Sequence, residues 1–103
     1  MARVRLTVRA RTDLKEIVAY TLRIWGKAQA AGYLDSVESH LQQLAELPLL
    51  GRRCSDFDDD LRRSEHAKHV IFYRQAPDGI VVSRILHQRM LVDLHVTDDD
   101  LSR

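Results

Sequence analysis

The chain has 103 residues, of which 45% are hydrophobic and 30% charged, and its formal net charge is +1. These values are typical of one soluble globular domain, and no apolar run approaches the roughly 20 residues that a membrane-spanning helix needs. The first ten residues alternate charged and aliphatic side chains, so we expect no signal peptide. The single cysteine, Cys54, excludes an internal disulfide and suits a reducing cytosol.

The first expected element is a half-buried strand over residues 3–9. Val4, Leu6 and Val8 alternate with polar residues, which places them on one face of an extended chain. The arginines between them suit the edge of a sheet, where charge discourages pairing with another chain.

Two helices are expected next. Thr12 is the expected N-cap of the first, apolar residues then recur at helical spacing as far as Trp25, and Gly26 is the expected glycine after its end. The second begins near Lys27 and ends before Pro48, which disfavours helical geometry at the preceding residue.

The link between these helices is so short that they should pack antiparallel as a helical hairpin. Trp25, Tyr20 and Tyr33 are expected to pack in the core or beside the contact of the two helices.

The remaining elements are strands. Residues 49–60 are an expected loop, residues 61–65 a strand, and residues 70–73 and 80–86 a β-hairpin around the turn signal of Pro77, Asp78 and Gly79. Along 80–86, strict alternation places Ile80, Val82, Arg84 and Leu86 on one face and the residues between them on the other. Arg84, His87 and Arg89 should therefore gather at the end of the hairpin.

The predicted fold class is α+β, with element order β-α-α-β-β-β and a helical hairpin packed on one face of a small antiparallel sheet. The other face of such a sheet is free to stay wet or to meet a partner. Residues 1–90 form the single expected domain. Residues 91–103 are a C-terminal tail that forms a short helical turn or frays.

Charge is distributed unevenly along this domain. Residues 62–89 hold six basic and two acidic residues, a formal charge of +4. A basic sheet of this kind suits an acidic partner or a phosphate backbone, and a solvated strand face is the alternative interpretation.

Several short motifs occur in a fixed order. They are WG at 25–26, QA at 29–30, YL at 33–34, LAxxPxxGR at 44–52, HVIFYR at 69–74 and ILHxRM at 85–90. In this combination the chain resembles the ParE toxins, a branch of the RelE/ParE toxin–antitoxin superfamily with the RelE/ParE-like fold. Ala67 and Gln88 stand where that family often has glycine. The first departure puts the turn before His69 in question, and the second affects the expected shape around His87.

The resemblance implies a cytoplasmic toxin that inhibits DNA gyrase by direct binding and is neutralised by a ParD-type antitoxin. The antitoxin would carry a ribbon-helix-helix DNA-binding domain, so operator DNA would be contacted only through it. No cofactor, metal or membrane is implied. The residues expected to contact the antitoxin or the target are Arg62, Arg63, Arg74, Arg84, His87 and Arg89.

The alternative function is that of the related RelE branch, a ribosome-dependent mRNA endoribonuclease. Such cleavage needs a base, an acid and cations for the phosphorane, roles that His87, Arg84, Arg89 and Tyr73 would take. The isoelectric point near 8.0 is low for docking on ribosomal RNA, and the ILHxRM motif resembles the branch without nuclease activity. We therefore prefer a binding inhibitor to an enzyme. A third reading is an antitoxin-binding protein that has lost its toxicity.

A metal site is the weakest of the candidate sites. His66-x-x-His69, Cys54 and the acidic residues of 56–60 lack the paired spacing of zinc and EF-hand sites. Solvated loop residues are the preferred interpretation.

Overall fold

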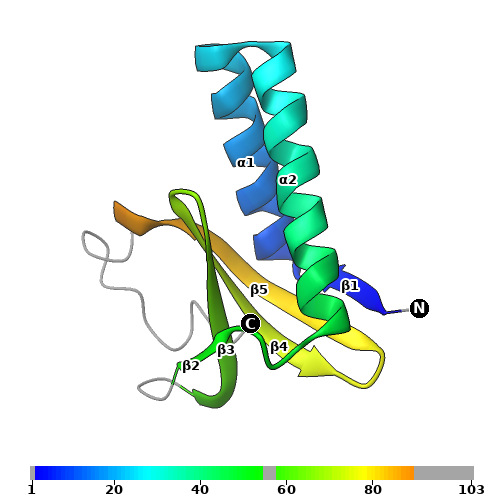
Figure 1. Ribbon diagram of the computed structural model, residues 1–103. Coiled ribbons are helices and arrows are strands. Elements are labelled where there is room, and N and C mark those ends of the chain that lie inside the picture. Colours follow the sequence, from blue (N-terminus) through cyan, green and yellow to red (C-terminus); the bar gives the residue numbers. More distant parts are fainter. Residues whose placement is uncertain (1, 55–57, 90–103) are drawn as a thin grey trace.

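In the computed structural model, which describes residues 2–54 and 58–89, two helices lie side by side against one face of a five-stranded sheet (Figure 1). The predicted α+β class is therefore confirmed. The expected tail, residues 91–103, lies outside the described residues. No helix of the described part is long and apolar enough to cross a membrane.

The sheet has the strand order β1-β5-β4-β3-β2. Its strands are β1 (Arg3–Leu6), β2 (Arg52–Cys54), β3 (Asp58–His66), β4 (His69–Ala76) and β5 (Gly79–His87). Neighbouring strands are antiparallel except for β1, which is parallel to β5, so the sheet is mixed where we expected it to be antiparallel. The additional strand β2 lies where we expected a loop. It was not predicted because three residues are too few for an alternation pattern to show.

The helices are α1 (Val8–Trp25) and α2 (Lys27–Glu46). The expected N-cap, Thr12, is wrong: Thr7 caps α1 by accepting a hydrogen bond from the Ala10 N–H at 3.1 Å. The Thr7 hydroxyl in turn donates to the Ser83 carbonyl at 2.8 Å. These two bonds end the first strand at Leu6, although the alternation of apolar residues continues to Val8.

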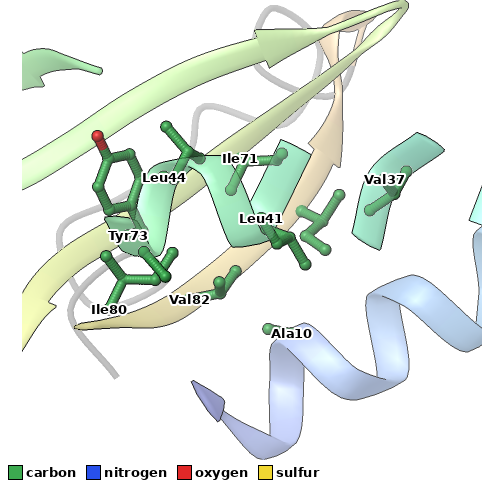
Figure 2. Packing of buried hydrophobic residues seen from close by; sticks show 10 residues of the cluster. Ala10, Val37, Leu41, Leu44, Ile71, Tyr73, Ile80 and Val82 are labelled. Atoms are coloured by element: carbon green, nitrogen blue, oxygen red, sulfur yellow. The ribbon is translucent and has the colours of Figure 1, made fainter. Parts of the chain in front are cut away.

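The main core joins both helices to the sheet (Figure 2). Its members are Ala10, Val37, Leu41, Leu44, Ala45, Ile71, Tyr73, Ile80, Val82 and Ile85. A second buried cluster lies on the opposite face of the sheet, and it consists of Cys54, Leu61, Val70, Phe72 and Leu86, none more than 6% exposed. This face is therefore apolar and buried along its centre, where we had left open that it stays wet or meets a partner.

A β-bulge in β5 decides which residues face the helices. Tyr73 pairs with Val82 and its neighbour Phe72 pairs with Arg84, so Ser83 is one extra residue in β5. The predicted alternation is consequently wrong beyond Ser83, and Ile85 packs on the helix side. Because both faces of β5 are buried, its apolar pattern carries no trace of the bulge.

Both hairpin turns use a positive φ at one position. Ala67, with φ of 53°, is the first of two residues that connect β3 to β4, a position where type II′ turns favour glycine. Gly79 has φ of 153°, and a Cβ there would collide with the backbone of Arg3. Gly79 thus lets β1 approach β5.

Candidate functional site

Arg84 fastens α1 to the edge of the sheet. Its Nε and Nη2 donate to the Asp13 carboxylate at 2.8 and 3.0 Å, and the two side chains are only 12% and 10% exposed. Asp13 also accepts the Ile85 N–H at 3.0 Å. Since β1 ends opposite Val82, Asp13 supplies the acceptor that a neighbouring strand would otherwise provide.

Sequence reasoning missed this role of Asp13. The signal was present in its position: Asp13 lies three residues after buried Ala10 and just before Leu14, on the apolar stripe of α1. A carboxylate on a buried helix face calls for a partner.

Tyr73 anchors the segment between α2 and β2. Its ring is fully buried, and its hydroxyl donates to the Pro48 carbonyl at 2.9 Å and accepts the Gly51 N–H at 2.7 Å. Burial raises the pKa of this hydroxyl. Gly51 has no room for a side chain, because a Cβ would overlap the Tyr73 hydroxyl.

His87 belongs to a group of four histidines from four different elements, which we call the histidine cluster. His40 lies in α2, His66 at the end of β3, His69 at the start of β4 and His87 at the end of β5. The His40 and His66 ring centroids are 4.9 Å apart, and those of His69 and His87 are 5.3 Å apart. Tyr33 of α2 lies between the two pairs, 5.6 Å from the His66 ring and 5.5 Å from the His69 ring.

The four residues named for RNA cleavage are not brought together. Tyr73 lies four residues along β4 from His69, the partner of His87, which is a separation of about 13 Å. Arg84 is held by Asp13. Only Arg89 lies beside His87, where its backbone N–H donates to the His87 Nδ1 at 3.1 Å.

A hollow of about 550 Å³ lies at the other end of the sheet, where two of the expected contact residues meet. It is lined by Leu49, Asp60, Arg62, Arg74, Gln75, Ala76 and Pro77. Arg62 is oriented by hydrogen bonds from its Nη1 to the Gly51 carbonyl at 2.7 Å and the Leu49 carbonyl at 3.4 Å. Leu49 is 64% exposed, so the hollow combines two guanidinium groups, one carboxylate and an apolar rim.

Arg63 lies instead on the face of the second cluster. Its guanidinium carbon is 5.6 Å from the centre of the Phe72 ring, and its Nη2 is 3.5 Å from the Glu65 carboxylate. Arg52 pairs with the same carboxylate. Arg63 thus covers apolar surface.

The connecting end of the two helices stands clear of the sheet (Figure 1). Tyr20, Leu22, Ile24 and Trp25 are exposed there, Trp25 by 67%. The prediction that Tyr20 and Trp25 pack in the core or the helix contact was wrong, because the helices extend beyond the elements that would cover them. Tyr33, which lies in α2, is partly buried against the core.

The described residues contain no group of three or more histidine, cysteine or acidic side chains arranged to hold a metal ion. His66 and His69 are engaged with serine, histidine and tyrosine partners. Cys54 is buried, and burial raises the pKa of its thiol.

Comparison with known proteins agrees with the motifs. A family model described as the ParE toxin of type II toxin-antitoxin systems, parDE, matches residues 4–92. Toxin ParE1 of Caulobacter vibrioides is 34% identical over 92 residues, which cover 89% of this chain and 95% of that protein. Toxin ParE1 of Mycobacterium tuberculosis is 36% identical over 89 residues, which cover 85% of this chain and 91% of that protein.

The fold agrees as well. A chain from a structure titled "Chromosomal ParDE TA system from P. aeruginosa" superposes with a TM-score of 0.68 at 18% identity, covering 84% of this chain and 96% of that one. With a match over most of its length and relatives above 30% identity, the chain belongs to the ParE toxin family of type II toxin–antitoxin systems.

Proposed function

We propose that this chain is a toxin that inhibits DNA gyrase by direct binding, in the cytoplasm, and that a ParD-type antitoxin neutralises it. The observation that carries the proposal is the family match over residues 4–92, since the relatives that it resembles are named ParE toxins. Operator DNA would be bound by the ribbon-helix-helix domain of the antitoxin and not by the toxin.

The geometry supports a binding inhibitor without catalytic turnover. Phosphodiester cleavage needs an acid, a base and a cation within reach of one phosphate. Arg84 is held by a buried carboxylate and the Tyr73 hydroxyl by two backbone groups. The family match is to ParE and not to the RelE ribonucleases that we considered as the alternative.

For the antitoxin contact, the hollow between Arg62 and Arg74 is the preferred surface. An acidic, amphipathic segment could place a carboxylate against these guanidinium groups and an apolar side chain against Leu49. Arg89, which is exposed beside His87, is a further candidate for contact with the antitoxin or with gyrase. Arg63 and Arg84 act within the fold in this proposal.

The function is tested with purified gyrase and relaxed plasmid. Adding the chain should block supercoiling in proportion to its concentration, and adding the co-expressed antitoxin beforehand should restore it. The same preparation should leave mRNA intact in a translating extract. Unimpaired supercoiling, with cleaved message on ribosomes, would refute the proposal.

The contact surface is tested separately. Replacing Arg62 and Arg74 together by alanine should weaken antitoxin binding by roughly tenfold or more, because two charge-assisted contacts are lost. Arg11→Ala is the matched control, an exposed arginine on α1 away from the hollow, and should leave the affinity unchanged. Equal affinities for the double variant and the control would show that the antitoxin binds another surface of the toxin.

A further inference from the structure

The histidine cluster is joined by short hydrogen bonds that tie α2 to the strands. The Nδ1 atoms of His40 and His66 are 2.8 Å apart, and the His40 Nε2 is 2.8 Å from the Ser64 hydroxyl. On the other side of the His66 ring, Nε2 is 3.0 Å from the Ser36 hydroxyl. These contacts connect the middle of α2 with the end of β3.

The proton positions along this chain follow from its one fixed donor. Ser36 donates its hydroxyl proton to the Tyr33 carbonyl at 2.8 Å, so towards His66 it can only accept. The His66 Nε2 must therefore carry a proton and donate it, which leaves the His66 Nδ1 as a lone pair when the ring is neutral. Across the 2.8 Å contact His40 must then donate from Nδ1, and its Nε2 accepts from Ser64.

The second pair of histidines is arranged in the same way. The Tyr33 hydroxyl is 2.5 Å from the His69 Nδ1 and 3.5 Å from the His66 carbonyl, so we assign its proton to the shorter contact, where His69 accepts. The His87 Nδ1 accepts the Arg89 backbone N–H at 3.1 Å. Every ring of the cluster thus uses one nitrogen as an acceptor.

A proton on any of these acceptors would turn it into a donor that faces another donor. Histidine changes its protonation near neutral pH more readily than any other side chain. The hydrogen bonds and ring contacts of the four rings involve no carboxylate among the described residues, so none of the described carboxylates is placed to balance an imidazolium. Glu65, the acidic residue next to His66, is paired with Arg52 and Arg63.

We propose that the histidine cluster is a proton-sensitive fastening between α2 and the β3–β4 hairpin, closed while its rings are neutral and opened when the His40–His66 pair binds a proton. The proximity of the rings to one another and their burial both disfavour the protonated form. Burial lowers the pKa of His40 and of His66, and proximity to His66 lowers that of His40 further. Burial, His87 and His66 together lower the pKa of His69 to about 4.

Opening should first affect the turn between β3 and β4. Ala67 and Lys68 connect His66 directly to His69, and Ala67 is held at a positive φ that alanine disfavours. The turn therefore depends on its flanking histidines to stay against α2. This inference does not depend on gyrase binding.

The proton positions are tested first, on the full chain at pH 7.5, by long-range proton–nitrogen NMR of the imidazole rings. The assignment requires a protonated Nδ1 on His40 and a protonated Nε2 on His66, His69 and His87. A neutral His66 that carries its proton on Nδ1 would overturn the proposal, whatever the behaviour of any variant.

The opening is tested by amide hydrogen exchange at residues 64–69, corrected for the intrinsic effect of pH. Between pH 7.5 and 5.0 the wild-type chain should lose protection by about tenfold or more, as expected for a local opening. The His40→Gln, His66→Gln double variant should lose less than about threefold, because glutamine can donate and accept without titrating.

Gln43→Ala is the matched control, because it changes an exposed residue of α2 that is not a member of the cluster. It should lose protection as the wild type does. Equal losses in the wild type and the double variant, or unchanged protection in the wild type, would overturn the proposal. If the double variant does not fold, the same exchange measurement is made on His66→Gln alone. The proposal then stands or falls on the loss of protection in that variant and on the proton positions.

Discussion

Two polar contacts hold the helices of this small protein to its sheet, and they are built from different chemistry. Asp13 and Arg84 join α1 to the edge of β5 through a charged, bidentate and nearly buried pair. The histidine cluster joins α2 to β3 and β4 through neutral rings and hydroxyl groups. The first contact places opposite charges together, whereas the second tolerates no charge on its acceptor nitrogens.

The difference predicts how each contact fails. A buried ion pair is strongly destabilised when one partner is removed, because the other charge stays buried without compensation. A network of neutral imidazoles is instead weakened by protons, since carboxylates as a class lose their charge near pH 4 and imidazoles gain theirs near pH 6.5. The two contacts are therefore separable by mutation and by pH.

Removing Asp13 should have the largest effect. Asp13→Ala removes the carboxylate that accepts from the Arg84 guanidinium and the Ile85 N–H, and it should lower the free energy of unfolding by roughly 3–5 kcal/mol. Urea unfolding at pH 7.5 measures this, with Glu16→Ala, an exposed acid of the same helix, as the control near zero. A loss below about 1 kcal/mol for Asp13→Ala would mean that the pair is not a main attachment of α1.

The histidine cluster should give a smaller, pH-dependent effect. The folded pKa of His69, about 4, lies below the value of 6.5 for an unfolded histidine, so the unfolded chain binds more protons between these two pH values. The contribution of neutral His69 to the free energy of unfolding is fully present above pH 6.5 and is lost as the pH falls toward 4. With allowance for its partial exposure we expect roughly 1–2 kcal/mol.

Urea unfolding from pH 7.5 to 4.5 checks this, with His69→Gln compared with the wild type. The difference in stability between the two proteins should shrink steadily as the pH falls. A difference that is constant across this range would show that the pKa of His69 is the same in the folded and the unfolded chain.

The turn between His66 and His69 should give the smallest effect, in the stabilising direction. Ala67 has φ of 53°, which costs an alanine roughly 1 kcal/mol and a glycine almost nothing. Ala67→Gly should therefore raise the free energy of unfolding by about 0.5–1 kcal/mol, part of the gain being lost to the greater freedom of glycine in the unfolded chain.

Ala31→Gly is the matched control, because Ala31 is exposed within α2 and the same exchange should there destabilise the protein by about 1 kcal/mol. Equal destabilisation by both substitutions would contradict the turn geometry described above.

The elements were largely predictable from the sequence, and the contacts between them were not. The helix that ends before Pro48 and the hairpin around Gly79 carry local signals that survive in the structure. The N-cap was misplaced because the Thr7 hydroxyl is fixed by Ser83, a residue 76 positions away. No local pattern reports a contact at that distance.

The candidate site shows the same limit. Arg84, His87 and Arg89 were expected to act together because they lie near the end of the hairpin, yet Arg84 is held by Asp13 of α1 whereas His87 lies beside His69. The histidine cluster was invisible in the sequence, where its members are spread from residue 40 to residue 87. The basic hollow was predictable only in part, because the charge was evident and the pairing of β3 with β4 brought Arg62 and Arg74 together.

The central claim, inhibition by binding without catalysis, is tested most directly by His87→Gln. Glutamine removes the imidazole that would transfer a proton in the nuclease alternative and keeps a hydrogen-bond acceptor for the Arg89 N–H. With circular dichroism and antitoxin binding as evidence of folding, the account predicts that the variant still inhibits gyrase supercoiling within about threefold of wild type, because general acid–base catalysis would instead cost roughly 10²–10⁴. A folded variant that has lost all toxicity, beside a wild type that cleaves message on the ribosome, would contradict it.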